Sequence, residues 1–310
     1  MARLRAERAS LLVLVLGAFA LRMALLQDQS LWPDEGISWY LAVRPEAFPQ
    51  ADHPPLYFLA LAGWVRLAGD SVLALRFFSV LPDVLLVAFL WRWGRRLGSS
   101  PAAGWGAALL WAASPLAVWY ATEVRGYTWL ALFGMLASYL LFIGGRPATY
   151  FLAGAAALLV HPFAAFLLGG HGWILWARWR CGNLARRWVG AWLSLPLAMI
   201  PWAVQAVRQM GNPTYWPGAF DPGEAVLGTL GTWVAGPSWA GDPTARQVGM
   251  ALLAVAALGA WAWAFRQRWP LGSVPAGWAL WGLLGFPLLG AGALAFVWPK
   301  YAPRYLMFLF

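Results

Sequence analysis

The sequence is poor in charged residues and in cysteine. Of its 310 residues, 11% are charged and 61% are hydrophobic, whereas soluble domains carry about 25% charged residues. The shortage of charge excludes an ordinary soluble domain. The single cysteine, Cys181, excludes a disulfide framework within the chain. Because Cys181 lies in the basic segment 178–187, we expect it to stay a reduced cytoplasmic thiol.

Other familiar features are also missing. There is no internal repeat, no soluble domain and no glycine-rich loop of the kind that binds nucleotide phosphates. No small-residue cleavage site follows the apolar stretch near the N-terminus, so residues 9–26 are predicted to be a retained first helix rather than a signal peptide. The net charge of +10 is interpreted as basic loops that face anionic lipid and the cytoplasm, not as a nucleic-acid surface.

Long apolar runs dominate what is present. A membrane span needs about 20 mostly apolar residues, and the 24 tryptophans and 33 glycines also fit a membrane protein. The sequence predicts an all-α polytopic membrane protein, with one transmembrane domain over residues 1–310. A further apolar run begins at Leu306, so we expect the natural sequence to continue. The predicted spans are 9–26, 73–91, 102–120, 126–143, 148–160, 162–177, 188–206, 247–265 and 275–298.

The orientation depends on the apolar segment 54–68, which opens with two prolines and contains Arg66. If it lies along the outer interface, the arginine clusters around 92–96, 178–187 and 266–268 all face the cytoplasm, as the positive-inside rule requires. All of the 12 acids except Glu7 and Asp83 then gather on the outer face. We therefore predict two long outward loops, 27–72 with interfacial helices and 207–246 as a flexible loop.

Two acidic motifs in the first outward loop are candidates for chemistry. Asp34 and Glu35 are adjacent carboxylates, which suit a general base or a metal ligand beside a base. Asp34 after Pro33 also fits a simple helix N-cap. Asp52 and His53 precede two prolines and can bind a divalent cation or grip a phosphate; a polar turn before an interfacial helix is the other interpretation.

Two basic motifs lie on the same predicted face. Arg125 can clamp a phosphate through its planar fork, and Glu123 can orient Arg125 or hold an acceptor hydroxyl. Lys300, the only lysine, and Arg304 place positive charge outside, against the topological bias, which favours an anionic ligand. The simpler interpretations are a Glu–Arg pair in a turn and an interfacial anchor.

Five further residues are less informative. His161, before Pro162, belongs either to the site or to a helix break, and His171 is expected to be a satisfied packing residue. Arg76 either joins the site or extends towards the headgroups. Arg22 and Asp83 lie at membrane depth and either pair or reach the outer cavity.

The order of these motifs resembles the GT-C glycosyltransferases of the protein O-mannosyltransferase and aminoarabinose-transferase type, glycosyltransferase family 39. The resemblance rests on LWPDEGISWY, then DHPPLYFLALAGWVRLAGDSVLALRFFSVL, SPLAVWYATEVRGYTWLALFGML and YAPRYLMF. It fits best over about residues 30–140 and more loosely up to 305.

The resemblance implies an inverting transfer of a sugar from a polyprenyl-phosphate carrier to an acceptor outside the cytoplasm. Asp34 would be the catalytic base, with Glu35 as its usual neighbour. Some relatives bind a divalent metal near this place, for which Asp52 and His53 are the candidates. The donor-phosphate ligands would be His53, Arg125, Lys300 and Arg304, supported by Tyr57, Arg76, Tyr120, Glu123, Tyr127 and His161.

The predicted partners are thus the lipid-linked donor, membrane lipid and a hydroxyl or glycan acceptor, at the plasma (inner) membrane with the site facing outward. The main alternative is a transporter or flippase for a lipid-linked sugar, which should place charges near the bilayer midplane in repeated halves. A non-catalytic scaffold is the third, and the clustered acids and bases disfavour it.

Overall fold

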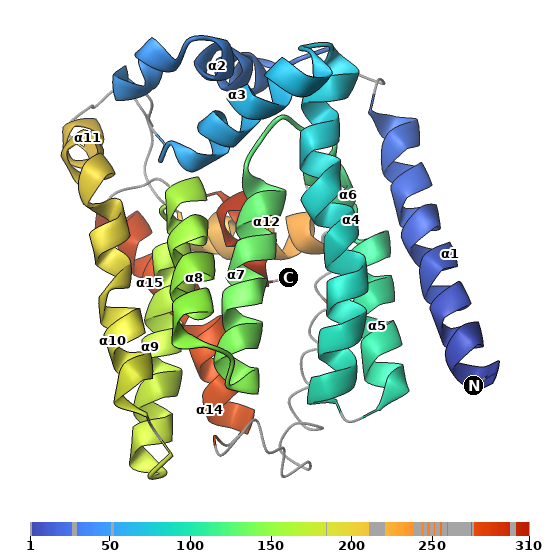
Figure 1. The fold of residues 1–310 in the computed structure, drawn as a ribbon, viewed down its shortest axis with the longest axis vertical. Helices are drawn as coiled ribbons and strands as arrows, with labels where there is room; N and C mark the ends of the chain where they lie inside the picture. Colours follow the sequence, from blue (N-terminus) through green and yellow to red (C-terminus); the bar gives the residue numbers. More distant parts are fainter. Residues whose placement is uncertain are drawn as a thin grey trace.

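The structure is a computed structural model, and it describes residues 2–26, 30–50, 53–98, 100–183, 185–210, 221–237, 276–297 and 302–309, with isolated positions between 243 and 274. The described chain is helical throughout, as predicted (Figure 1). The long and middle-length helices are α1 (Ala2–Leu25), α4 (Val72–Leu97), α5 (Pro101–Ala113), α7 (Tyr127–Ile143), α8 (Pro147–Val160) and α9 (Ala164–Arg180).

Within the described residues, three helices are long and apolar enough to cross a membrane by length and composition: Arg5–Leu25, Val72–Leu97 and Gly277–Phe296. A fourth span results if α5 and α6 (Pro115–Ala121), which meet at a bend of 55°, are counted together. Helices α7 and α8 fall where spans are predicted but have 17 and 14 residues. The chain is an all-α polytopic membrane protein, although fewer helices than the nine predicted segments reach spanning length.

The first predicted loop lies across one end of the bundle. Helices α2 (Pro33–Val43) and α3 (Leu56–Ala68), joined through the 3-10 helix η1 (Pro45–Gln50), lie over the ends of the long helices (Figure 1). The 13 residues of α3 extend only about 20 Å, too short for the roughly 30 Å hydrocarbon layer. The structure thus agrees with an interfacial rather than spanning segment at 54–68.

Two predicted segments are corrected. The span at 188–206 is broken into α10 (Arg186–Leu193), the 3-10 helix η2 (Leu195–Met199) and α11 (Ile200–Met210), with Pro196 and Pro201 at the breaks because proline lacks the N–H donor of a continuous helix. The loop 207–246 contains a helix, α12 (Pro222–Ala235). The predicted span 247–265 lies largely outside the described residues.

The last predicted span, 275–298, is confirmed as one helix of spanning length that contains a π-helical turn. It consists of α14 (Ala276–Leu280), a π-helical turn η3 (Trp281–Gly285) and α15 (Phe286–Val297), followed by η4 (Pro303–Leu309). Helix α9 meets the π turn where two glycines face each other, since a Cβ on Gly170 would lie 1.7 Å from the Gly282 carbonyl oxygen. Small residues allow such close contact between membrane helices.

Local sequence explains where the helices begin. Pro33, Pro101 and Pro115 occupy the first turns of their helices, where the missing N–H has no intrahelical partner to lose. Ser71 and Ser114 cap α4 and α6 by accepting hydrogen bonds from the N–H groups of Ala74 and Ala117.

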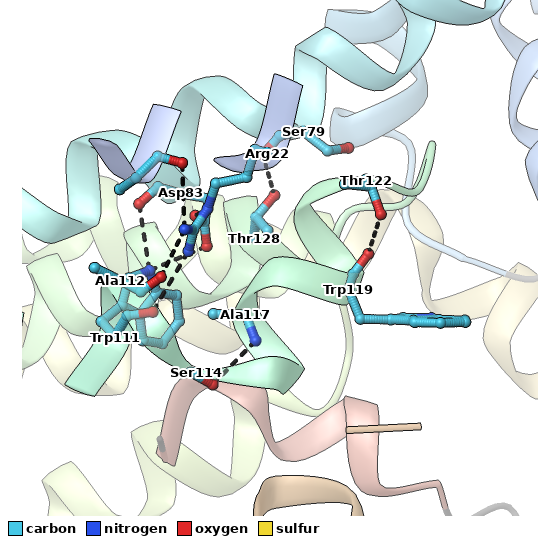
Figure 2. Close-up of polar contacts among 11 residues, drawn as sticks. Arg22, Ser79, Asp83, Trp111, Ala112, Ser114, Ala117, Trp119, Thr122 and Thr128 are labelled. Atoms are coloured by element: carbon cyan, nitrogen blue, oxygen red, sulfur yellow. Dashed lines mark hydrogen bonds and ion pairs between the residues drawn. The ribbon is translucent and has the colours of Figure 1, made fainter. Parts of the chain in front are cut away.

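The prediction that Arg22 and Asp83 pair is confirmed. The Arg22 Nε donates to Asp83 Oδ2 at 2.7 Å, and both side chains are fully buried (Figure 2). Asp83 Oδ1 also accepts a 3.0 Å hydrogen bond from Trp111 Nε1, and Arg22 Nη1 donates to the Ala112 carbonyl at 2.7 Å. The pair therefore ties α1 and α4 to the end of α5, where the break leaves carbonyls without helical N–H partners.

His171 is a satisfied packing residue, as predicted. Its Nε2 lies 3.0 Å from Ser138 Oγ, and its Nδ1 lies 3.1 Å from the Tyr150 hydroxyl. Ser138 Oγ donates its proton to the Gly134 carbonyl, so it accepts from His171 Nε2 and Tyr150 donates to Nδ1.

Candidate active site

The two adjacent carboxylates of α2 have opposite surroundings, beginning with Glu35. Glu35 is fully buried, and Arg76 forms two bonds to it, from Nε to Oε1 at 2.9 Å and from Nη2 to Oε2 at 2.8 Å. The backbone N–H groups of Val124 and Trp32 complete its shell at 2.9 and 3.2 Å. Arg76 also donates to the Leu26 carbonyl at 2.7 Å. Glu35 thus joins α2, α4 and the turn after α6.

Asp34 is accessible by contrast. Its side chain is 31% exposed, and the Arg125 Nη2 lies 3.8 Å from Asp34 Oδ2. The guanidinium is placed by α2 itself, because Arg125 Nη1 donates to the Asp34 carbonyl at 3.3 Å and contacts Ser38 Oγ at 3.4 Å. Asp34 and Ser38 lie four residues apart and therefore share one face of α2.

A small cavity begins on the other side of Arg125. Helices α2, α3, α7 and α8 all contribute to its wall. The lining residues are Ser38, His53, Tyr57, Phe58, Arg125, Gly126, Tyr127, Val160 and His161. The cavity therefore places a cation, two imidazoles and two phenols within one site at the interfacial end of the bundle.

His161 presents a neutral imidazole to this cavity. Burial, together with the electrostatic effect of the neighbouring His53, Arg125 and Arg304, holds the pKa of His161 well below its usual value. Its Nδ1 accepts a 3.2 Å hydrogen bond from the Phe163 N–H, so the proton of the neutral ring is on Nε2. That Nε2 is buried with no partner among the described atoms, and is thus a donor available to a ligand.

Arg304 lies in an aromatic cage above the same region. Its Cζ is 5.9 Å from the centres of the Trp32 and Tyr127 rings and 5.6 Å from that of Tyr305, distances typical of cation–π contacts. The Tyr127 ring is also 5.8 Å from Arg125 Cζ. Tyr127 therefore lies between two guanidinium groups that come from distant parts of the sequence.

Glu123 is a buried acid in the turn between α6 and α7. Trp119 Nε1 donates to its Oε1 at 2.7 Å, whereas its Oε2 is buried without a partner among the described atoms. The pKa of Glu123 is raised to about 7, chiefly because burial disfavours the ionised form. No direct ion pair between Glu123 and Arg125 is found; the neighbours share a backbone contact, from Arg125 N to the Glu123 carbonyl at 2.8 Å.

The structure brings together most of the predicted site residues. His53 packs edge-on against His161, with ring centres 5.2 Å apart, and Tyr120 packs against Tyr127 at 5.0 Å. Lys300 and Asp52 lie outside the described residues. Within the described part of the chain, no group of three or more His, Cys, Asp or Glu side chains is arranged to hold a metal, so the metal site at Asp52 and His53 stays a prediction.

Four residues of the site were not among the predicted ones. Trp32 and Tyr305 surround Arg304, Trp119 holds Glu123, and Ser38 contacts Arg125. Ser38 could have been predicted from the sequence, because it lies one helical turn after Asp34. Trp32 and Trp119 could not have been predicted, because tryptophan is common throughout this sequence.

A family model described as dolichyl-phosphate-mannose-protein mannosyltransferase matches residues 52–204. No curated protein and no solved structure matches the chain significantly. The matched stretch contains Arg76, Glu123, Arg125 and His161, whereas Asp34 and Arg304 lie outside it.

The helical fold and this match support a membrane glycosyltransferase of the GT-C type. Within that class, the match supports the protein mannosyltransferase type. The resemblance seen in the sequence motifs is thereby confirmed.

Proposed function

We propose that the chain transfers a sugar from a polyprenyl-phosphate carrier to a hydroxyl acceptor on the non-cytoplasmic side of the plasma membrane, with inversion at the anomeric carbon and Asp34 as general base. The observation that carries the proposal is the contrast between Asp34 and Glu35. A base must reach the acceptor proton, and Asp34 is partly exposed beside the cavity. Every oxygen of Glu35 is already occupied by donors, so Glu35 is assigned a positioning role.

The chemistry of the cavity wall supports an anionic donor group. Arg125 in the wall supplies positive charge, and the His161 Nε2–H supplies a neutral donor. Arg304 adds a second positive charge outside the wall, against the ring of the lining residue Tyr127. Charge-assisted hydrogen bonds to phosphate are stronger than neutral ones and favour a departing phosphate. Lys300 and His53 remain proposed as further phosphate ligands, and Tyr57, Tyr120 and Tyr127 as supporting residues.

The proposed transfer is a displacement at the anomeric carbon of the sugar. Asp34 takes the proton of the acceptor hydroxyl while the acceptor oxygen forms a bond to the anomeric carbon. The bond from that carbon to the phosphate oxygen breaks, and its electron pair stays on the polyprenyl phosphate. Attack opposite the leaving group inverts the anomeric configuration. Positioning both substrates at one membrane interface supplies much of the rate enhancement.

The test compares Asp34→Asn with the wild-type protein in membranes supplied with polyprenyl-phosphate sugars and candidate acceptors. Sugar transfer should fall by about 10²-fold or more, as expected for removal of a general base. Binding of a prenyl methyl phosphodiester, which carries the phosphate but no sugar, should change less than about threefold. Unchanged turnover in Asp34→Asn would refute the assignment of the base.

The same assay separates transfer from transport. A flippase or transporter would move the labelled lipid across proteoliposomes without consuming it, and the Asp34→Asn variant would retain that movement. We propose transfer because Asp34 and Glu35 belong to α2, which lies across one end of the bundle (Figure 1), and the turn that carries Arg125 contacts them there. Transporters typically place such charges near the midplane instead.

A further inference from the structure

Glu123 is a buried acid of the site whose Oε2 makes no hydrogen bond that would stabilise the fold. The residue as a whole is 9% exposed, and Trp119 Nε1 fixes its Oε1 at 2.7 Å while the buried Oε2 has no partner among the described atoms. A buried carboxylate oxygen without a hydrogen bond is costly. The arrangement is stable only if the group is neutral or if a ligand completes its contacts.

Among the charged neighbours of Glu123, Arg304 favours its ionised form most strongly, and Arg125 does so more weakly. The negative charge of Glu35 opposes ionisation. Arg304 lies in η4, which packs on α6, and its charge also acts on Tyr120, three residues before Glu123. The buried side chains of α12, which packs on α6 and η4, are Thr229 and Thr232 and carry no charge. The charged and titratable groups that act on Glu123 or on its neighbours Tyr120 and His161 are Glu35 (α2), His53, Arg125 in the turn before α7, Tyr127 (α7) and Arg304 (η4); Arg22 (α1), Arg76 and Asp83 (α4) lie on the helices packed around them.

Of the three buried acids among the described residues, Glu35, Asp83 and Glu123, only Glu123 has no ion pair. Arg22 and Asp83 neutralise each other at 2.7 Å, and Arg76 and Glu35 do so at 2.8 Å. The imidazole of His161 is neutral, and the arginines do not deprotonate. The proton on Glu123 therefore decides whether the Arg304 region carries an additional negative charge.

We propose that Glu123 is a charge-setting residue of the donor site: its neutral form lets Arg304 attract the lipid phosphate, and its ionised form competes with that phosphate for Arg304. This inference rests on the proposed function, because it assumes that the site binds a phosphate. It gives the site a mechanism for binding a phosphate anion tightly in one protonation state and releasing it in the other.

The protonation state of Glu123 sets how the phosphate affinity changes with pH. Below a pH of about 7, the value to which burial raises the pKa, Glu123 is neutral and phosphate affinity is high. Above it the carboxylate repels the phosphate, so affinity falls as pH rises. An added unit charge about 10 Å away at an effective dielectric of about 20 changes affinity roughly tenfold.

The experiment measures the binding of a prenyl methyl phosphodiester to the purified full chain in nanodiscs between pH 5.5 and 8.5. The phosphodiester keeps one negative charge over this range, so any titration belongs to the protein. The Kd of the wild-type protein should rise about tenfold from pH 6 to pH 8. Glu123→Gln should match the wild type at pH 6 and keep that affinity at pH 8.

The exposed acid Glu46, whose side chain is 69% exposed on η1, supplies the matched control, and Glu46→Gln should keep the wild-type pH profile. Glu123→Asp retains a titratable carboxyl and should retain a pH-dependent Kd, which decides the matter if Glu123→Gln does not fold. A wild-type Kd that is flat with pH, or a Glu123→Gln profile equal to that of the wild type, would overturn the inference while leaving the proposed function intact. No binding at any pH would overturn both.

Discussion

At the scale of single residues, neighbouring carboxylates differ because of what surrounds them. Asp34 and Glu35 have the same chemistry and adjacent positions, yet one is partly exposed beside Arg125 and the other is enclosed by four donors. The sequence shows that both acids are present at a helix start. It does not show that Arg76, 41 positions later, selects Glu35 as its partner.

Replacing Glu35 should damage the fold before it affects chemistry. In Glu35→Gln, the one amide oxygen can satisfy two of the four donors, and the amide NH₂ faces the other two. Breaking a buried ion pair in this way costs about 3–5 kcal/mol. We expect a lower thermal denaturation temperature in detergent.

Glu46→Gln is again the control, because the exposed pair of Glu46 with Arg44, 3.7 Å apart, should contribute under about 1 kcal/mol. If Glu35→Gln kept the wild-type denaturation temperature while losing all transfer, Glu35 would have a catalytic role instead.

The sequence predicts the ionisable residues of the site but not the aromatic contacts around them. Asp34, His53, Arg125 and Arg304 are rare ionisable residues in an apolar sequence, so their presence alone marks them. Contacts such as that of Tyr305 with Arg304 depend on the packing of distant helices. Such contacts leave no local pattern in a sequence where aromatic residues are common.

At the scale of helices, apolar runs predict where helices lie but not where they break. Residues 188–206 are uniformly apolar enough for a span, yet Pro196 and Pro201 divide them into three short helices. Pro82 lies within α4 without breaking it, because the Phe78 carbonyl that loses its helical partner accepts a 3.1 Å hydrogen bond from Trp129 Nε1. Whether a proline breaks a membrane helix thus depends on a partner that the local sequence does not reveal.

The Arg22–Asp83 pair is expected to hold α1 against α4 and α5. Arg22→Met leaves a buried Asp83 carboxylate without its cation and removes the donor to the Ala112 carbonyl. Loss of one partner of a buried pair costs about 3–5 kcal/mol. The denaturation temperature in detergent should therefore fall clearly.

The double variant Arg22→Met with Asp83→Leu should recover part of that loss, because no buried charge remains. Equal stabilities for Arg22→Met and the double variant would show that the lost carbonyl contacts, rather than the unpaired carboxylate, cause the effect.

At the scale of the whole molecule, charge separates along the bundle. Asp34, Glu35 and Glu123 lie at the end covered by α2 and α3, whereas the arginines that end α4 and α9 lie at the opposite end (Figure 1). Arginine-rich ends stay in the cytoplasm under the positive-inside rule. The acids of the candidate site should therefore face outward, which gives the proposed transfer its side of the membrane.

The single native cysteine makes this orientation testable. Cys181 is exposed directly after α9, at the basic end, so a membrane-impermeant maleimide should label it only after the cells are permeabilised. In a Cys181→Ser background, Glu46→Cys on η1 should be labelled in intact cells, because η1 joins the two helices that cover the opposite end. Cys181→Ser alone is the control for background labelling. Labelling of Cys181, and not of Glu46→Cys, in intact cells would reverse the topology and place Asp34 in the cytoplasm, where the proposed transfer outside the cell does not occur.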